Sequence, residues 1–143
     1  MLGRINALDS LDWRLFFLST ASLPVLRTAL ALLSLETVED CVAASLRFLP
    51  KSGRRADLAK LRRAVFRAGR WVPGGRHCLS RALLMQTLLR RNDIPCEIKI
   101  GVNKSEESFK AHAWVVAAGR VICGDRSDLD SFVELPDWQG AVR

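Results

Sequence analysis

The chain has 143 residues, of which 49% are hydrophobic, and it carries a formal net charge of +7 at pH 7. A chain of this length can bury one core, so we predict a single domain over residues 1–143, with a helical part in 1–72 and a second part in 73–143. The four cysteines have no CxxC spacing, and the first residues lack the order of a signal peptide. Both observations favour a reducing, cytoplasmic compartment and argue against a disulfide-built secreted domain.

The first fifty residues predict three helices. Residues 9–10 can cap the first, and Pro24 suits the first turn of a second helix that runs to about residue 33. Residues 37–40, Thr-Val-Glu-Asp, resemble a capping box that would begin a third helix. The apolar run over residues 15–35 is interrupted by Pro24 and Arg27, so we expect core helices and no membrane span.

Residues 56–72 predict an amphipathic basic helix. Its apolar residues recur at helical spacing, and a separate face carries a basic stripe. The stripe consists of Lys60, Arg63, Arg67 and Arg70. It is either a solvated face or a surface that docks a partner. Neither interleaved aromatic residues nor a glycine-rich phosphate loop accompanies it, so we expect no nucleic-acid partner.

Another helix is predicted over residues 76–91, after the basic helix. It begins after the breaker Pro73-Gly74-Gly75 and ends before Ile94-Pro95. Apolar residues cover most of its circumference, which predicts a buried core helix. Cys78 then lies in its first turn. The free N–H groups and the positive end of the helix dipole favour a thiolate there, which is the form a cysteine nucleophile needs.

The period of the apolar pattern changes after this helix. Residues 96–102 alternate as in a strand with one buried face, residues 103–108 read as a polar loop, and residues 109–117 and 120–125 read as a hairpin. Residues 131–135 could either add an edge strand or cover the core. The expected architecture is therefore α+β, with N-terminal helices and a core helix that packs on a small antiparallel sheet.

The hairpin turn decides which acid faces the only histidine in a strand, His112. A two-residue turn at 118–119 pairs Val115 with Ile122 and His112 with Asp125. A three-residue loop would shift the pairing by one position and turn Asp125 to the other face. The other acids that could serve are Asp128 and Asp130.

The ordered motifs resemble those of the transglutaminase-like leader peptidases of lasso-peptide biosynthesis. The resemblance covers residues 60–125. It rests on His77-Cys78-Leu79-Ser80-Arg81-Ala82-Leu83, Leu88-Leu89-Arg90-Arg91, Ile94-Pro95, Ile100-Gly101-Val102, Ala111-His112-Ala113-Trp114-Val115 and Gly119-Arg120-Val121. The chain departs from the family pattern at Asp93, where a glycine usually precedes Ile-Pro.

The resemblance implies a papain-like or transglutaminase-like fold and a cysteine peptidase that removes the leader from a ribosomally made precursor. It assigns the nucleophile to Cys78, the base to His112 and the orienting acid to Asp125, without cofactor or metal. The partners it implies are the precursor leader peptide, a separate leader-recognition protein of winged-helix type and an ATP-dependent lasso cyclase. A separate protein is expected because residues 1–72 lack a three-strand pattern.

Two alternatives remain open at the level of sequence. In the first, an amine replaces water in the second step, so the enzyme would be an acyltransferase of the same fold. In the second, the chain is a basic adaptor protein whose catalytic fold has degenerated, and Cys78 would then be unreactive. A zinc site is disfavoured because adjacent ligands at His77 and Cys78 would diverge on a helix.

Overall fold

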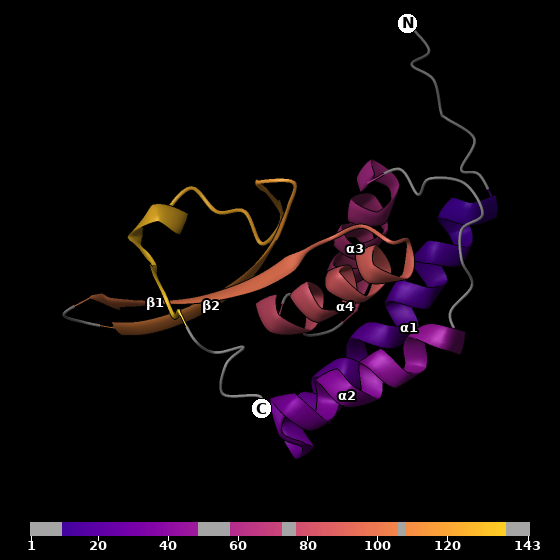
Figure 1. Ribbon diagram of the computed structural model, residues 1–143, viewed down its shortest axis with the longest axis horizontal. Helices are drawn as coiled ribbons and strands as arrows, with labels where there is room; N and C mark the ends of the chain where they lie inside the picture. Colours follow the sequence, from indigo (N-terminus) through magenta and orange to yellow (C-terminus); the bar gives the residue numbers. More distant parts are fainter. Residues whose placement is uncertain (1–9, 49–57, 73–76, 106–107, 137–143) are drawn as a thin grey trace, which may run out of the picture.

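The computed structural model describes residues 10–48, 58–72, 77–105 and 108–136. Its helices gather at one end of the molecule and a small sheet extends from them, so that the fold is α+β (Figure 1). The helices are α1 (Ser10–Leu32), α2 (Leu35–Ser45), α3 (Leu58–Trp71) and α4 (Cys78–Arg91), with short 3-10 turns η1 (Leu46–Phe48) and η2 (Leu129–Ser131). The strands are β1 (Glu97–Ser105), β2 (Ser108–Ala117), β3 (Arg120–Cys123) and β4 (Val133–Glu134).

Helix α4 is the centre of the core, as its apolar circumference predicts. It contacts α1, α2 and α3 on one side and β1, β2 and β3 on the other. Leu83, Met85 and Leu89 are fully buried. Burial of each such side chain is worth about 2 to 3 kcal/mol relative to exposure, so the position of α4 is strongly fixed. After α4, Asp93 adopts a positive φ of 57°, the left-handed conformation that glycine adopts most readily.

The prediction of two short N-terminal helices is wrong, because α1 continues through Pro24. A proline inside a helix removes one hydrogen bond and costs about 3 kcal/mol. Burial on either side of it offsets this cost, since Leu23 and Leu26 are both in the core. By length and composition alone, Asp12–Leu32 could also cross a membrane, and 22% of its most apolar window is buried.

The start of α2 also differs from the prediction. Ser34 is the N-cap, and its hydroxyl accepts a hydrogen bond from the Thr37 backbone N–H at 3.3 Å. The helix therefore begins at Leu35, before the predicted capping box. The shift brings Val38 into the core, where it is 2% exposed.

The sheet has the order β3-β2-β1-β4 and its described pairs are antiparallel. Strands β1 and β2 pair from Glu97↔Val116 to Ser105↔Ser108, so most of the predicted polar loop over residues 103–108 belongs to the strands. Residues 106–107 lie outside the described residues. Of the two alternatives for residues 131–135, the structure shows the edge strand, because β4 pairs with β1.

A β-bulge in the β2–β3 hairpin overturns the predicted pairing of Val115 with Ile122. The turn itself is as predicted, since Ala117 pairs with Arg120 across Ala118 and Gly119. Beyond Val116 the register shifts by one, and Val115 pairs with Cys123. Because β3 contains one extra residue at the bulge, each residue of β2 before Val116 lies opposite a residue one position later than a count from the turn predicts. The predicted pairing of His112 with Asp125 is lost with it.

Candidate active site

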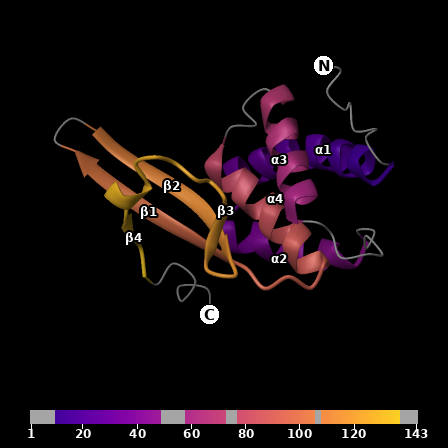
Figure 2. The ribbon, with the colours of Figure 1, turned by 90° about the horizontal axis from the view of Figure 1, so that it is seen from above.

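A cavity of about 510 Å³ lies between the first turn of α4, α3, the middle of β2 and the end of β3. Its walls include all three residues predicted for catalysis, Cys78, His112 and Asp125. Figure 2 shows why these distant segments meet, because α4 runs beside the half of the sheet that holds β2 and β3. The packing of α4 on the sheet therefore brings the cysteine and the histidine to one cavity.

Cys78 is the first residue of α4 and is half-buried in the cavity wall. His77 precedes it as N-cap with extended backbone (φ −61°, ψ 117°), and its side chain makes no capping hydrogen bond. The first N–H groups of a helix lack intrahelical acceptors and carry partial positive charge. Cys78 therefore combines an accessible thiol with backbone donors that can stabilise negative charge beside it.

His112 lies on β2 with its imidazole almost entirely buried, at 8% exposure. Its ring is 5.6 Å from the Phe132 ring and stacks on Trp114 at 6.1 Å between centroids. The ring Nε2 lies 2.7 Å from the Gly124 carbonyl oxygen. A carbonyl only accepts, so Nε2 must be the donor and carry the hydrogen. In the neutral ring Nδ1 then keeps its lone pair and can act as a base.

Gly124 is required by the backbone at this point. It has a positive φ of 86°, and an added Cβ would lie 2.7 Å from the Ala113 carbonyl oxygen and 2.9 Å from Trp114 Cα. The bulge on β3 brings its backbone against β2 so closely that no side chain fits. This close approach delivers the Gly124 carbonyl to His112 Nε2.

Asp125 lines the cavity but its carboxylate binds Arg62 of α3, with Arg62 Nη2 3.1 Å from Asp125 Oδ2. The group bonded to His112 is the neighbouring carbonyl of Gly124, one residue earlier. The two alternative acids lie elsewhere. Asp128 pairs with Arg126 at 2.8 Å, and Asp130 is exposed in η2.

The other cysteines differ from Cys78 in their surroundings. Burial raises the pKa of the Cys123 thiol, and the nearby Arg81 guanidinium opposes that rise. Burial likewise raises the pKa of Cys96, whose thiol lies 3.8 Å from the Gln86 carbonyl oxygen. Cys41 is exposed on α2. No group of three or more His, Cys, Asp or Glu side chains within the described ranges could hold a metal ion.

These shifts predict which thiols resist alkylation. A raised pKa leaves less thiolate at any pH below it, and the thiolate is the reactive form. At about pH 7.5 we expect iodoacetamide to modify Cys78 and Cys41, while Cys96 and Cys123 stay largely unmodified. Peptide mass mapping measures the order. Early modification of Cys123 would contradict the structure.

The sequence comparisons agree with the α+β fold. A model of the transglutaminase-like superfamily matches residues 21–137. The chain belongs to the transglutaminase-like superfamily. No curated protein and no solved structure matches it. The matched range includes α2 to β4, and therefore every described residue of the cavity.

Superfamily membership indicates a cysteine protease or an acyltransferase type of activity. Among the cavity residues for which the sequence predicted no part in catalysis are Phe66, Arg81 and Gly124. The signal for Gly124 was visible, since a glycine directly after a strand often marks a bulge or a close backbone approach. The positions of Phe66 and Arg81 depend on how α3 packs on α4, which local patterns do not encode.

Proposed function

We propose that the chain is a cysteine peptidase that removes the leader peptide from a ribosomally made lasso-peptide precursor. The cavity shared by Cys78 and His112 is the observation that supports catalysis. Cys78 lies in its wall at a helix N-terminus, and the Gly124 carbonyl accepts a hydrogen bond from the His112 ring. The choice of substrate rests on the ordered motifs around Cys78 and His112. Incubation with a precursor and mass analysis of the released leader tests it directly.

In the proposed mechanism, His112 Nδ1 accepts the Cys78 thiol proton, and the thiolate attacks the scissile carbonyl carbon. The Cys78 backbone N–H then donates to the developing oxyanion. His112 returns the proton to the leaving amine, which yields a thioester on Cys78 and a free peptide amine. A water that His112 deprotonates attacks the thioester, and the products are the second peptide carboxylate and the restored thiol.

Asp125 has an indirect role in this proposal. Its ion pair with Arg62 ties the segment after β3 to α3, and so holds the adjacent Gly124 carbonyl in place. Exposed pairs of this kind contribute about 0 to 1 kcal/mol, so the segment should survive its loss. His112 by contrast is the proposed base, and the other histidine of the cavity wall, His77, is the exposed N-cap residue of α4.

Accordingly, we expect Asp125→Asn to lower kcat/KM by less than about 30-fold, while His112→Ala lowers it by about 10³-fold or more. Steady-state rates on the precursor measure both, with Asp40→Asn on the exposed face of α2 as a control outside the cavity. An Asp125→Asn loss as large as that of His112→Ala would contradict the indirect role. Asp125 would then have to leave Arg62 and bind His112 during turnover.

Acyl transfer is the alternative function, and it shares with the peptidase mechanism the formation of the Cys78 thioester. It differs in that an amine, in place of water, attacks the Cys78 thioester. Product mass separates the two, because hydrolysis adds one water to the acyl fragment and aminolysis adds the amine. Exclusive formation of the amide in the presence of a peptide amine would replace the peptidase by the transferase.

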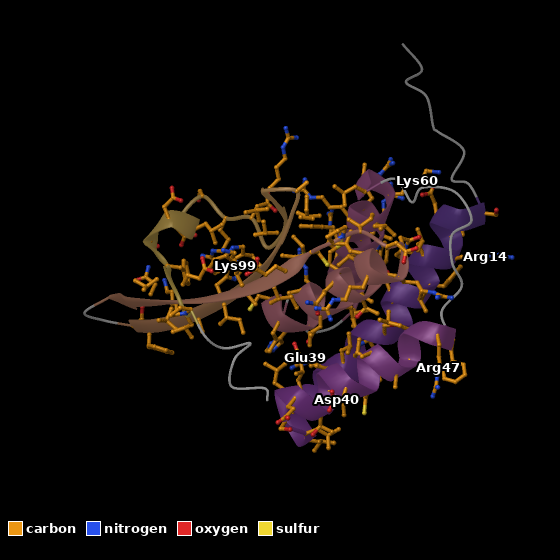
Figure 3. The ribbon with its side chains drawn as sticks, viewed as in Figure 1. Arg14, Glu39, Asp40, Arg47, Lys60 and Lys99 are labelled. Atoms are coloured by element: carbon orange, nitrogen blue, oxygen red, sulfur yellow. The ribbon has the colours of Figure 1, made fainter. Side chains whose placement is uncertain are left out.

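The leader-recognition protein is a further proposed partner, and α3 and α1 supply its candidate docking surface. Trp13, Phe16, Arg67 and Trp71 surround a hollow of about 370 Å³. Figure 3 shows Lys60 of α3 and Arg14 of α1 at the same end of the molecule, far from the tip of the β1–β2 hairpin. Exposed tryptophan and arginine together are typical of energetic centres in protein interfaces. The partner proposal fails if this chain alone binds the leader as tightly as both proteins together.

A further inference from the structure

Arg81 lies on α4 three residues after Cys78, on the same face of the helix. Residues at this spacing have Cβ atoms about 5–6 Å apart. The side chain of Arg81 is half-buried and forms part of the cavity wall together with Cys78 and His112. A positive charge is therefore fixed within one helical turn of the proposed nucleophile.

The contacts of Arg81 hold its guanidinium in place without neutralising it. The guanidinium carbon lies 4.3 Å from the centroid of the Phe66 ring, a cation-π contact. The Cys123 thiol is a polar neighbour of the guanidinium. Nε is buried and has no hydrogen-bond partner within the described residues. A buried N–H without an acceptor costs about 1 to 3 kcal/mol, so this arrangement is stabilised by any ligand that supplies one.

The neighbouring arginines are already paired. Arg62 binds Asp125, and Arg126 binds Asp128 through two hydrogen bonds of 2.8 and 3.0 Å. Arg81 forms no ion pair with any carboxylate in the part of the chain that the structure describes. It is therefore the arginine of the cavity wall that is available for a carboxylate from outside.

We propose that Arg81 binds a carboxylate of the substrate, so that the enzyme prefers an acidic residue directly beside the carbonyl that Cys78 attacks. The inference rests on the proposed function in that Cys78 is the nucleophile. The planar guanidinium matches a carboxylate with two parallel hydrogen bonds, and the half-buried wall strengthens the attraction. The Phe66 ring lies against the guanidinium, whose N–H donors lie along its planar edge.

Two alkylating reagents test this without a substrate. Iodoacetate carries a carboxylate next to its reactive carbon, and iodoacetamide carries a neutral amide at the same place. The ratio of their rates at Cys78 cancels the thiolate fraction, which both reagents share. We expect Arg81→Gln to lower this ratio about tenfold, because it removes a charge-assisted hydrogen bond. Arg70→Gln removes an exposed charge of the same sign from α3 and should change the ratio less than about twofold.

The outcomes separate this inference from the proposed function. A normal iodoacetamide rate with a ratio that does not depend on Arg81 overturns the carboxylate site and leaves the nucleophile intact. If Cys78 reacts with neither reagent, the proposed function fails. The carboxylate site is then tested separately, by the NMR resonance of the Arg81 Nε–H group. That resonance is assigned by its loss in Arg81→Lys. A shift on addition of glutarate supports the carboxylate site, and the absence of a shift overturns it.

Discussion

Replacing Cys78 by alanine should abolish cleavage of the precursor, with a loss of about 10⁴-fold or more. The proposed mechanism forms a covalent bond to Cys78 Sγ, and no other described residue of the cavity wall presents an accessible thiol, because Cys123 is 1% exposed. Removal of a nucleophile typically reduces the rate to the small residue that oriented binding alone supplies. Rates of leader release, followed by mass spectrometry, give the comparison.

Cys41→Ala is the matched control, since it removes an exposed thiol from α2 and leaves the cavity untouched. It should retain the activity of the wild-type protein within about twofold. The Cys78→Ala protein should also keep its thermal stability, because Cys78 is only half-buried. Precursor cleavage by Cys78→Ala at the wild-type rate would exclude the cysteine mechanism.

Gly124→Ala should strongly lower both the stability and the activity of the protein. The new Cβ would lie 2.7 Å from the Ala113 carbonyl oxygen and 2.9 Å from Trp114 Cα, at a φ of 86° that alanine rarely adopts. Backbone strain alone costs about 1–3 kcal/mol, and the clash with backbone atoms adds to it. We expect the melting temperature to fall by about 10 °C, together with activity, because the carbonyl that holds His112 is displaced.

Gly119→Ala separates the clash from the strain. Gly119 also has a positive φ, of 72°, but an added Cβ meets no atom within 4 Å. Only the conformational cost of about 1 kcal/mol remains, so its melting temperature should fall by about 4 °C. Thermal unfolding followed by circular dichroism compares the two variants. Equal losses would show that contact with Trp114 is not what requires glycine at residue 124.

The architecture follows from the sequence where the local patterns are strong. The basic helix, the core helix that carries Cys78, and the turn at Ala118 and Gly119 are all present at the predicted positions, within a few residues. Each has its own marker in the sequence, such as the breaker before the core helix or the glycine in the turn between two apolar runs. The union of Cys78 and His112 in one cavity follows from the order of these elements.

The errors arise where tertiary packing opposes a local rule. Pro24 is a helix breaker in isolation, but burial of Leu23 and Leu26 keeps α1 continuous. The bulge beyond Val116 has no marker in the turn, so counting pairs from the turn placed Asp125 opposite His112. With the extra residue on β3, Asp125 no longer pairs with His112; the Gly124 carbonyl bonds to the imidazole, and Asp125 binds Arg62. An acid predicted by register is only as secure as every pair between it and the turn.

The most direct test of the central claim is the rate of iodoacetamide modification of Cys78 and Cys41 between about pH 5 and 9, in the wild-type protein and in His112→Ala. Cys41 serves as the exposed reference thiol in the same chain. If His112 activates Cys78, Cys78 reacts faster than Cys41 at about pH 6–7, and the His112→Ala protein loses that advantage. Equal rates for the two thiols in the wild-type protein would contradict the account and favour the adaptor.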